Sequence, residues 1–87
     1  MIEKNITISA PNGLHARPAG ELVRLAKSLA PTRITLSAGA KSVNASSMLS
    51  VLSLGLKSGT SVTIKAEGGD ESEAVRSISD FILSIKD

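Results

Sequence analysis

Four segments of the chain alternate apolar and polar residues, which is the period of a β-strand that buries one face. They span Met1–Ser9, Arg33–Ser37, Lys41–Val43 and Ser61–Glu67. Residues that favour turns follow the first and second segments, at Ala10-Pro11-Asn12-Gly13 and Ala38-Gly39-Ala40. The pattern predicts four strands, of which the second and third form a hairpin.

Three other segments place apolar residues three and four positions apart, which is the spacing of an amphipathic helix. They are predicted at Ala16–Leu29, from Ser46 or Ser47 to Leu56, and after the capping-box pattern Asp70-x-x-Glu73. Pro31 ends the first helix. Pro18 is tolerated in its first turn, because the earliest amides of a helix have no acceptor inside it.

The predicted order of elements is βαββαβα. Each of the three helices has one apolar face, which it can bury by packing against one face of a sheet. We therefore predict an α+β fold, a small open-faced β-sandwich with a four-stranded, mainly antiparallel sheet and three helices on one face. A chain of 87 residues forms one domain, residues 1–87. Because Phe81 is the only aromatic residue, the core must be aliphatic.

The composition narrows the function classes. The chain has no cysteine and one histidine, so disulfides, thiolate chemistry and a zinc site are excluded, and we predict no metal and no cofactor. The chain has neither an apolar run of about 20 residues, as a membrane span needs, nor a signal peptide, so we expect a cytoplasmic protein without membrane insertion. We also expect a monomer. The net charge of +2 comes from dispersed cations without aromatic neighbours, which favours acidic protein partners over nucleic acid.

The candidate chemistry lies around His15, at the predicted start of the first helix. Near neutral pH an imidazole is largely unprotonated, so a ring nitrogen has a lone pair that can attack phosphorus. The amides and dipole of a helix N-terminus favour an anion, and Arg17 adds a permanent charge with forked donors. These residues favour transient binding of phosphate. The ordinary alternatives are a surface or capping role for His15 and an exposed ion pair between Arg17 and Glu21.

The run Gly13-Leu14-His15-Ala16-Arg17-Pro18-Ala19 resembles the active-site signature of the HPr family, the histidine-containing phosphocarriers of the phosphoenolpyruvate:sugar phosphotransferase system. The resemblance extends through Val43-Asn44-Ala45-x-Ser47, Ser53-Leu54-Gly55-Leu56 and Thr63-Ile64-x-Ala66-Glu67-Gly68. It implies a relay carrier that is not itself an enzyme. The phosphoryl group would arrive from phosphorylated enzyme I and leave to the IIA domains of sugar transporters.

The resemblance also implies roles for single residues. His15 would carry the phosphoryl group on the ring nitrogen nearer the backbone, and Arg17 would contact that group. The amides of Ala16 and Arg17 would bind it, with Asn12 within reach. Ser47 aligns with a serine that a dedicated kinase phosphorylates in many family members. The family commonly has a basic residue just before that serine, where this chain has Ser46, and a plain helix cap is the alternative role for Ser47.

The second helix has an apolar arc too wide for one contact with a sheet. Val51 and Leu54 point one way, and Met48, Leu49 and Leu52 extend round to another face. We predict that these three form an exposed docking patch, with a short helix buried on several sides as the alternative. Arg24 and Lys27, on the Arg17 side of the first helix, would steer acidic partners. A regulatory HPr-like protein without a role in sugar transport is the rival function.

Overall fold

The computed structural model describes residues 2–85, and its elements follow the predicted βαββαβα order. The strands are β1 (Ile2–Thr7), β2 (Arg33–Ala38), β3 (Lys41–Asn44) and β4 (Ser61–Glu67). The helices are α1 (Ala16–Ser28), α2 (Met48–Ser53) and α3 (Glu71–Leu83). Within residues 2–85, no helix is long and apolar enough to cross a membrane.

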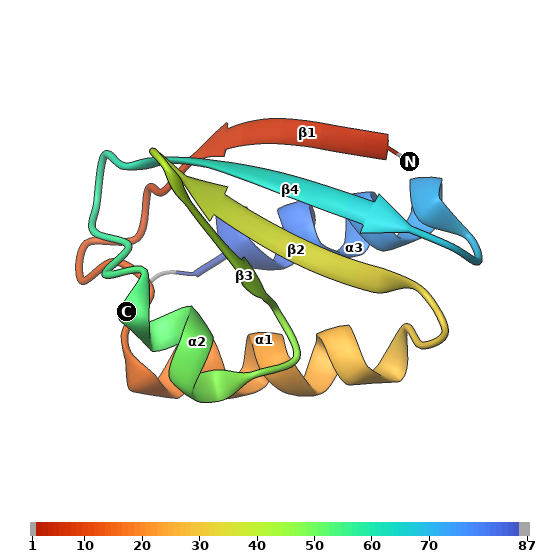
Figure 1. Cartoon of the computed structure of the whole chain (residues 1–87). Helices are drawn as coiled ribbons and strands as arrows, with labels where there is room; N and C mark the ends of the chain where they lie inside the picture. Colours follow the sequence, from red (N-terminus) through yellow and green to blue (C-terminus); the bar gives the residue numbers. More distant parts are fainter. Residues whose placement is uncertain (1, 86–87) are drawn as a thin grey trace.

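The sheet order is β1-β4-β2-β3, and each pair of neighbours is antiparallel. All three helices lie on one face of the sheet and leave the other face open (Figure 1). The predicted fold class is therefore confirmed. Met1, the first residue of the predicted first strand, lies outside the described residues.

The core between the sheet and the helices is aliphatic, as the composition predicts. Its largest fully buried hydrophobic side chains are Ile8, Leu22, Leu36, Val51, Val62, Ile64, Ile78 and Ile82. Each such side chain contributes roughly 1.5–3 kcal/mol through burial. Phe81 packs at the margin of this core and is only partly buried.

Helix α2 is shorter than predicted. It ends at Ser53, not at Leu56, because Gly55 takes a left-handed conformation with φ +59° and its N–H donates to the Leu52 carbonyl. A glycine just after the last helical turn is a common stop signal. Leu56 nevertheless reaches the core, from the loop that follows.

One predicted strand end and one predicted capping motif need correction. Strand β1 ends at Thr7, and Ile8 instead exchanges backbone hydrogen bonds with residues 59 and 60. The capping box is half formed: the Asp70 carboxylate accepts from the Glu73 N–H at 3.3 Å, but the Glu73 carboxylate pairs with Arg76.

Ser79 in α3 is a polar residue buried in the core. It is fully buried, and its hydroxyl has no hydrogen-bond partner among the described residues. We expect Ser79→Ala to raise the free energy of unfolding by about 1 kcal/mol, because alanine needs no partner and favours helix. Thermal unfolding checks this, with the partly exposed Ser77→Ala as control. Equal gains from both variants would assign the effect to helix propensity alone.

Candidate functional site

The loop that carries His15 is fixed to a second loop, which connects α2 to β4. The Leu14 N–H donates to the Leu56 carbonyl at 2.8 Å. The Ile8 N–H donates to the Thr60 carbonyl at 2.8 Å, and the Ile8 carbonyl accepts from the Gly59 N–H at 2.7 Å. These bonds hold both ends of the His15 loop, so the start of α1 has a defined position.

Gly13 allows the closest approach between these two loops. Its φ is +65°, and a Cβ atom there would lie 2.3 Å from the Leu56 carbonyl oxygen and 2.8 Å from the Lys57 Cα. Both neighbours are backbone atoms, which cannot move aside as a flexible side chain can. Glycine is therefore required at this position by conformation and by space.

His15 is the N-cap residue of α1, as its place before the helix predicts. Its backbone is extended (φ −84°, ψ −175°), its carbonyl accepts from the Ala19 N–H at 2.9 Å, and its side chain makes no capping hydrogen bond. The side chain is half-buried. Its Nε2 atom is enclosed without a hydrogen-bond partner among residues 2–85. The imidazole thus serves neither as a helix cap nor as a core hydrogen-bonding group.

The first turn of α1 supplies donors for an anion. Amides in the first turn of a helix point out of its N-terminal end, and here they belong to Ala16 and Arg17, while Pro18 has none. The Ala16 and Arg17 side chains are exposed, and Pro18 and Ala19 anchor the turn in the core. Asn12 is exposed in the turn just before His15. The structure therefore brings all four predicted phosphate-site residues to one end of α1.

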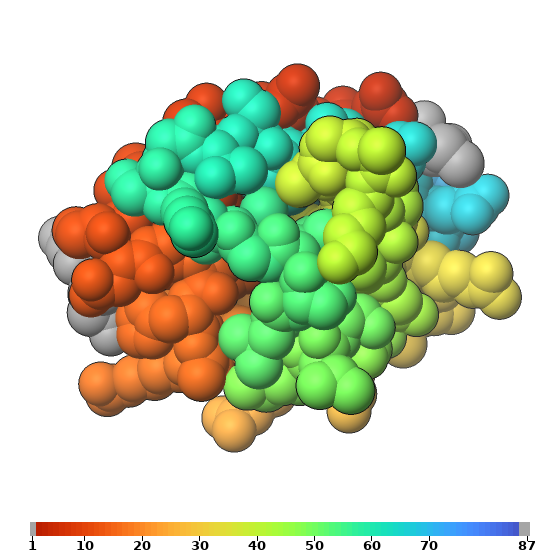
Figure 2. All heavy atoms as spheres, turned by 60° about the vertical axis from the view of Figure 1, so that its left-hand side comes forward, coloured from red at the N-terminus to blue at the C-terminus, as the bar shows by residue number. Residues whose placement is uncertain are grey.

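The α2 patch is exposed, as predicted. Leu49 is 81% exposed, and Met48 and Leu52 are each 37% exposed, whereas Val51 is buried. The alternative of a helix buried on several sides is therefore wrong. Figure 2 shows α2 in green on the same face as the His15 loop and the start of α1 in orange.

The two adjacent serines before α2 differ in their hydrogen bonds. Ser47 is the N-cap, and its oxygen accepts from the Ser50 N–H at 3.4 Å. Ser46 donates its hydroxyl proton to the Asn44 Oδ1 at 2.7 Å. Within residues 2–85 the Ser47 hydroxyl thus accepts a hydrogen bond and donates none, whereas the Ser46 hydroxyl donates its proton to Asn44.

Two further residues were predicted to take part in partner binding, and one contact at the site is visible only in the structure. Arg24 and Lys27 are exposed on α1, as a steering role requires. The support that Leu56 gives to the His15 loop cannot be seen in the sequence, because a contact between distant loops leaves no local pattern. Within residues 2–85, no three His, Asp or Glu side chains are grouped so that they could hold a metal ion.

Residues 2–84 match the family model described as the PTS HPr component phosphorylation site. The chain is 40% identical over 86 residues to the phosphocarrier protein HPr of Haemophilus influenzae, and the match covers 99% of this chain and all of that protein. A crystal structure of HPr from Thermoanaerobacter tengcongensis superposes with a TM-score of 0.91 at 40% identity, over 97% of this chain and 93% of that one.

A more distant solved structure is the catabolite repression protein Crh of Bacillus subtilis, a dimer with a swapped domain. It has 31% identity and a TM-score of 0.77, over 99% of this chain and 98% of that one. The monomer expected for this chain stays a prediction beside such a dimer. The match over nearly the whole length, together with the geometry around His15, shows that this chain belongs to the HPr family, the phosphocarrier proteins of the phosphotransferase system.

Proposed function

We propose that this protein accepts a phosphoryl group on His15 from phosphorylated enzyme I and passes it to the IIA domains of sugar transporters. The observation that carries the proposal is the place of His15 at the N-terminal end of α1, with Nε2 enclosed and no capping hydrogen bond from the side chain. The family supports a carrier that undergoes the reaction as a substrate, with no turnover of its own. We place this relay in the cytoplasm.

The chemistry needs positioning and charge more than proton transfer. The Nδ1 lone pair attacks phosphorus, the new N–P bond forms as the bond to the donor breaks, and the same step in reverse hands the group to the acceptor. Oxygens of the phosphoryl group would meet the amides of Ala16 and Arg17, the Arg17 guanidinium and Asn12. Charge-assisted hydrogen bonds of this kind are roughly twice as strong as neutral ones.

Mass spectrometry tests the transfer directly. The protein is mixed with phosphoenolpyruvate, magnesium and enzyme I, and then measured intact and as peptides. We expect one acid-labile phosphoryl group on His15 and none on His15→Ala. The His15 side chain makes no capping bond, so this variant removes the acceptor without removing a helix cap. An unmodified wild-type protein beside a competent enzyme I would instead favour the regulatory role, for which the likeness to Crh is the supporting observation.

The docking surface for these partners is proposed to be the α2 patch of Met48, Leu49 and Leu52, with Arg24 and Lys27 beside it. An apolar centre with a charged margin is the usual plan of a protein interface. Both partners would bind the same face, since the His15 loop and α2 share it (Figure 2).

We expect Leu49→Glu to weaken binding to enzyme I by at least about tenfold, since a buried apolar anchor commonly accounts for more than about 1 kcal/mol. Its melting temperature should stay almost unchanged, because the side chain is 81% exposed. Ile2→Glu is the matched control, because Ile2 is 40% exposed at the far end of the sheet. Titration calorimetry and thermal unfolding give both quantities. A large loss of stability in Leu49→Glu would contradict the docking role.

Ser47 is proposed as a regulatory phosphorylation site for an HPr serine kinase/phosphorylase. The supporting observation is that its hydroxyl donates no hydrogen bond within residues 2–85, in contrast to that of Ser46. A phosphate at this position would put negative charge beside the docking patch.

We expect Ser47→Asp to keep the fold, because aspartate is as good an N-cap as serine. Its affinity for enzyme I should fall by at least about fivefold, because the new charge faces an acidic partner. Ser72→Asp adds the same charge in the first turn of α3 and serves as control. Equal affinities of Ser47→Asp and wild type in a titration would contradict this role.

A further inference from the structure

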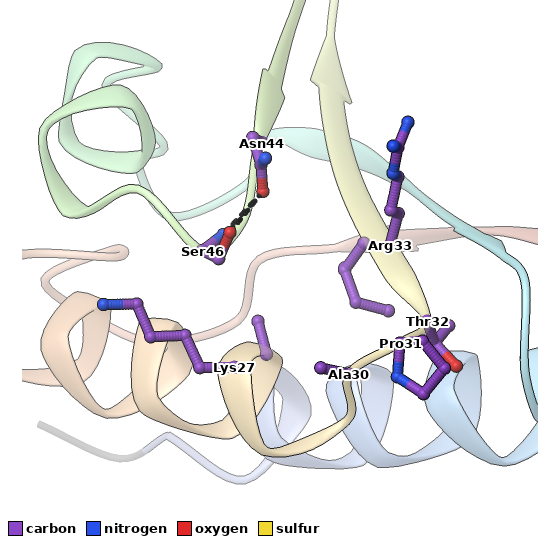
Figure 3. A pocket seen from close by; sticks show the side chains of 9 residues that line it. Lys27, Ala30, Pro31, Thr32, Arg33, Asn44 and Ser46 are labelled. Atoms are coloured by element: carbon purple, nitrogen blue, oxygen red, sulfur yellow. Dashed lines mark hydrogen bonds between the residues drawn. The ribbon is translucent and has the colours of Figure 1, made fainter.

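A cavity lies at the opposite end of α1 from His15. Its volume is about 250 Å³, and it lies between the end of α1, the start of β2 and the connection from β3 to α2. Figure 3 shows the open space, with the Ala30 methyl directed into it. None of the roles proposed above uses this cavity.

Short side chains create the cavity. Ala26 and Ala30 are four residues apart, on the side of the chain that faces Asn44 and Ser46, and neither has atoms beyond Cβ. Pro31 and Ile34 complete an apolar wall. This wall can therefore make hydrophobic contacts with a ligand.

The opposite edge of the cavity is polar. The hydrogen bonds at this edge determine which donors remain available to a ligand. The Asn44 Oδ1 accepts from the Ser46 N–H at 2.9 Å and from the Ser46 hydroxyl at 2.7 Å. Because a backbone N–H can only donate, the amide oxygen must face Ser46, so the Asn44 NH₂ group is left over. Within the described residues, no acceptor binds that NH₂ group.

Positive charge adjoins this edge. Figure 3 shows the Lys27 side chain running past Ser46, with its ammonium on the side away from Ala30 and Pro31, while Arg33 points away along the sheet. A lysine has a flexible four-carbon stem, so its ammonium can turn toward the cavity. None of the lining residues is acidic. The polar edge thus offers donors and positive charge, which fit an anion.

We propose that this cavity binds a small organic carboxylate with a compact apolar body. The carboxylate would accept from Lys27 and from the Asn44 NH₂ group, and the apolar body would lie on Ala26, Ala30 and Ile34. The volume of about 250 Å³ gives room for a small organic molecule. The apolar wall favours such a molecule over inorganic phosphate, which would leave that wall without a partner. The ligand would lie next to Ser46, one residue from Ser47.

A titration with benzoate, followed by amide NMR, tests this site, and benzamide is a neutral probe of the same shape. We expect saturable shifts at Ser46, at Ala30 and at the Asn44 side-chain NH₂, in the millimolar range. Benzamide should bind at least about fivefold more weakly, the loss expected when one charge-assisted hydrogen bond becomes neutral. Equal binding of benzamide would overturn the assignment to an anion, and shifts that do not saturate would overturn the site.

Three variants locate the site. Ala30→Leu should abolish the saturable shifts by filling the space, and Lys27→Gln should weaken binding at least about fivefold. Arg24→Gln removes the same charge from α1 outside the cavity and should leave the affinity unchanged. Shifts at sheet residues far from the cavity check that each variant is folded. Wild-type affinity in folded Ala30→Leu and Lys27→Gln would overturn the proposal, whatever the result for phosphoryl transfer to His15.

Discussion

Replacing Gly13 by alanine is expected to lower the free energy of unfolding by about 2–4 kcal/mol. Two effects add at this position. Alanine is strained at φ +65°, and its Cβ would lie 2.3 Å from the Leu56 carbonyl oxygen. Because the Leu14 N–H donates to that same oxygen, relief of the clash would break the bond that holds the His15 loop. Thermal unfolding should show a melting temperature lower by more than about 10 °C.

Gly39→Ala separates these two effects. Gly39 has φ +60° in the turn between β2 and β3, but a Cβ there would meet nothing within 4 Å. Only the conformational strain remains, about 1–2 kcal/mol. Phosphoryl acceptance should slow in Gly13→Ala and stay unchanged in Gly39→Ala, because only Gly13 lies in the loop that positions His15. Equal losses of stability would mean that the contact with Leu56 contributes nothing.

Local patterns predict most of the elements because each half-buried strand and amphipathic helix repeats its own period. Strand β4 is predicted to the residue, at Ser61–Glu67, since it pairs on both sides and buries alternate residues. The hydrophobic pattern does not show where α2 ends, because apolar residues continue past Gly55 although the left-handed conformation of that glycine ends the helix. Helix propensity and periodicity do not indicate where the backbone changes direction.

The candidate site likewise has features that the sequence predicts and features that depend on the tertiary structure. The residues proposed to carry the chemistry are close together in sequence, so His15 and Arg17 could be singled out from their order and from the helix start. The exposed patch was predictable because Met48, Leu49 and Leu52 cover more of the α2 circumference than one contact can bury. The bond from Leu14 to Leu56 and the space between Ala30 and Asn44 depend on how distant segments meet. No local sequence pattern predicts such contacts between distant segments.

Removal of the Arg17 side chain is the second large effect that we expect. Arg17→Ala should lower the rate of phosphoryl acceptance from enzyme I about 100-fold, because a fixed donor aimed at developing charge commonly accounts for 10²–10³ in rate. Arg17→Lys keeps the charge but loses the fork that matches phosphate oxygens, so about a tenfold loss is expected. Rapid-quench measurements at saturating enzyme I give these rates.

Arg24→Ala distinguishes a phosphate contact from general attraction of an acidic partner. Arg24 is exposed on α1 two turns beyond Arg17, and its loss should slow association several-fold at low salt without changing the rate at saturation. Added salt screens such steering, so the difference between Arg24→Ala and wild type should vanish as ionic strength rises. The Arg17→Ala defect should persist in high salt, because it arises after the complex has formed. If both defects vanished together with salt, Arg17 would act only by steering, and the amides at the start of α1 would be left to hold the phosphoryl group.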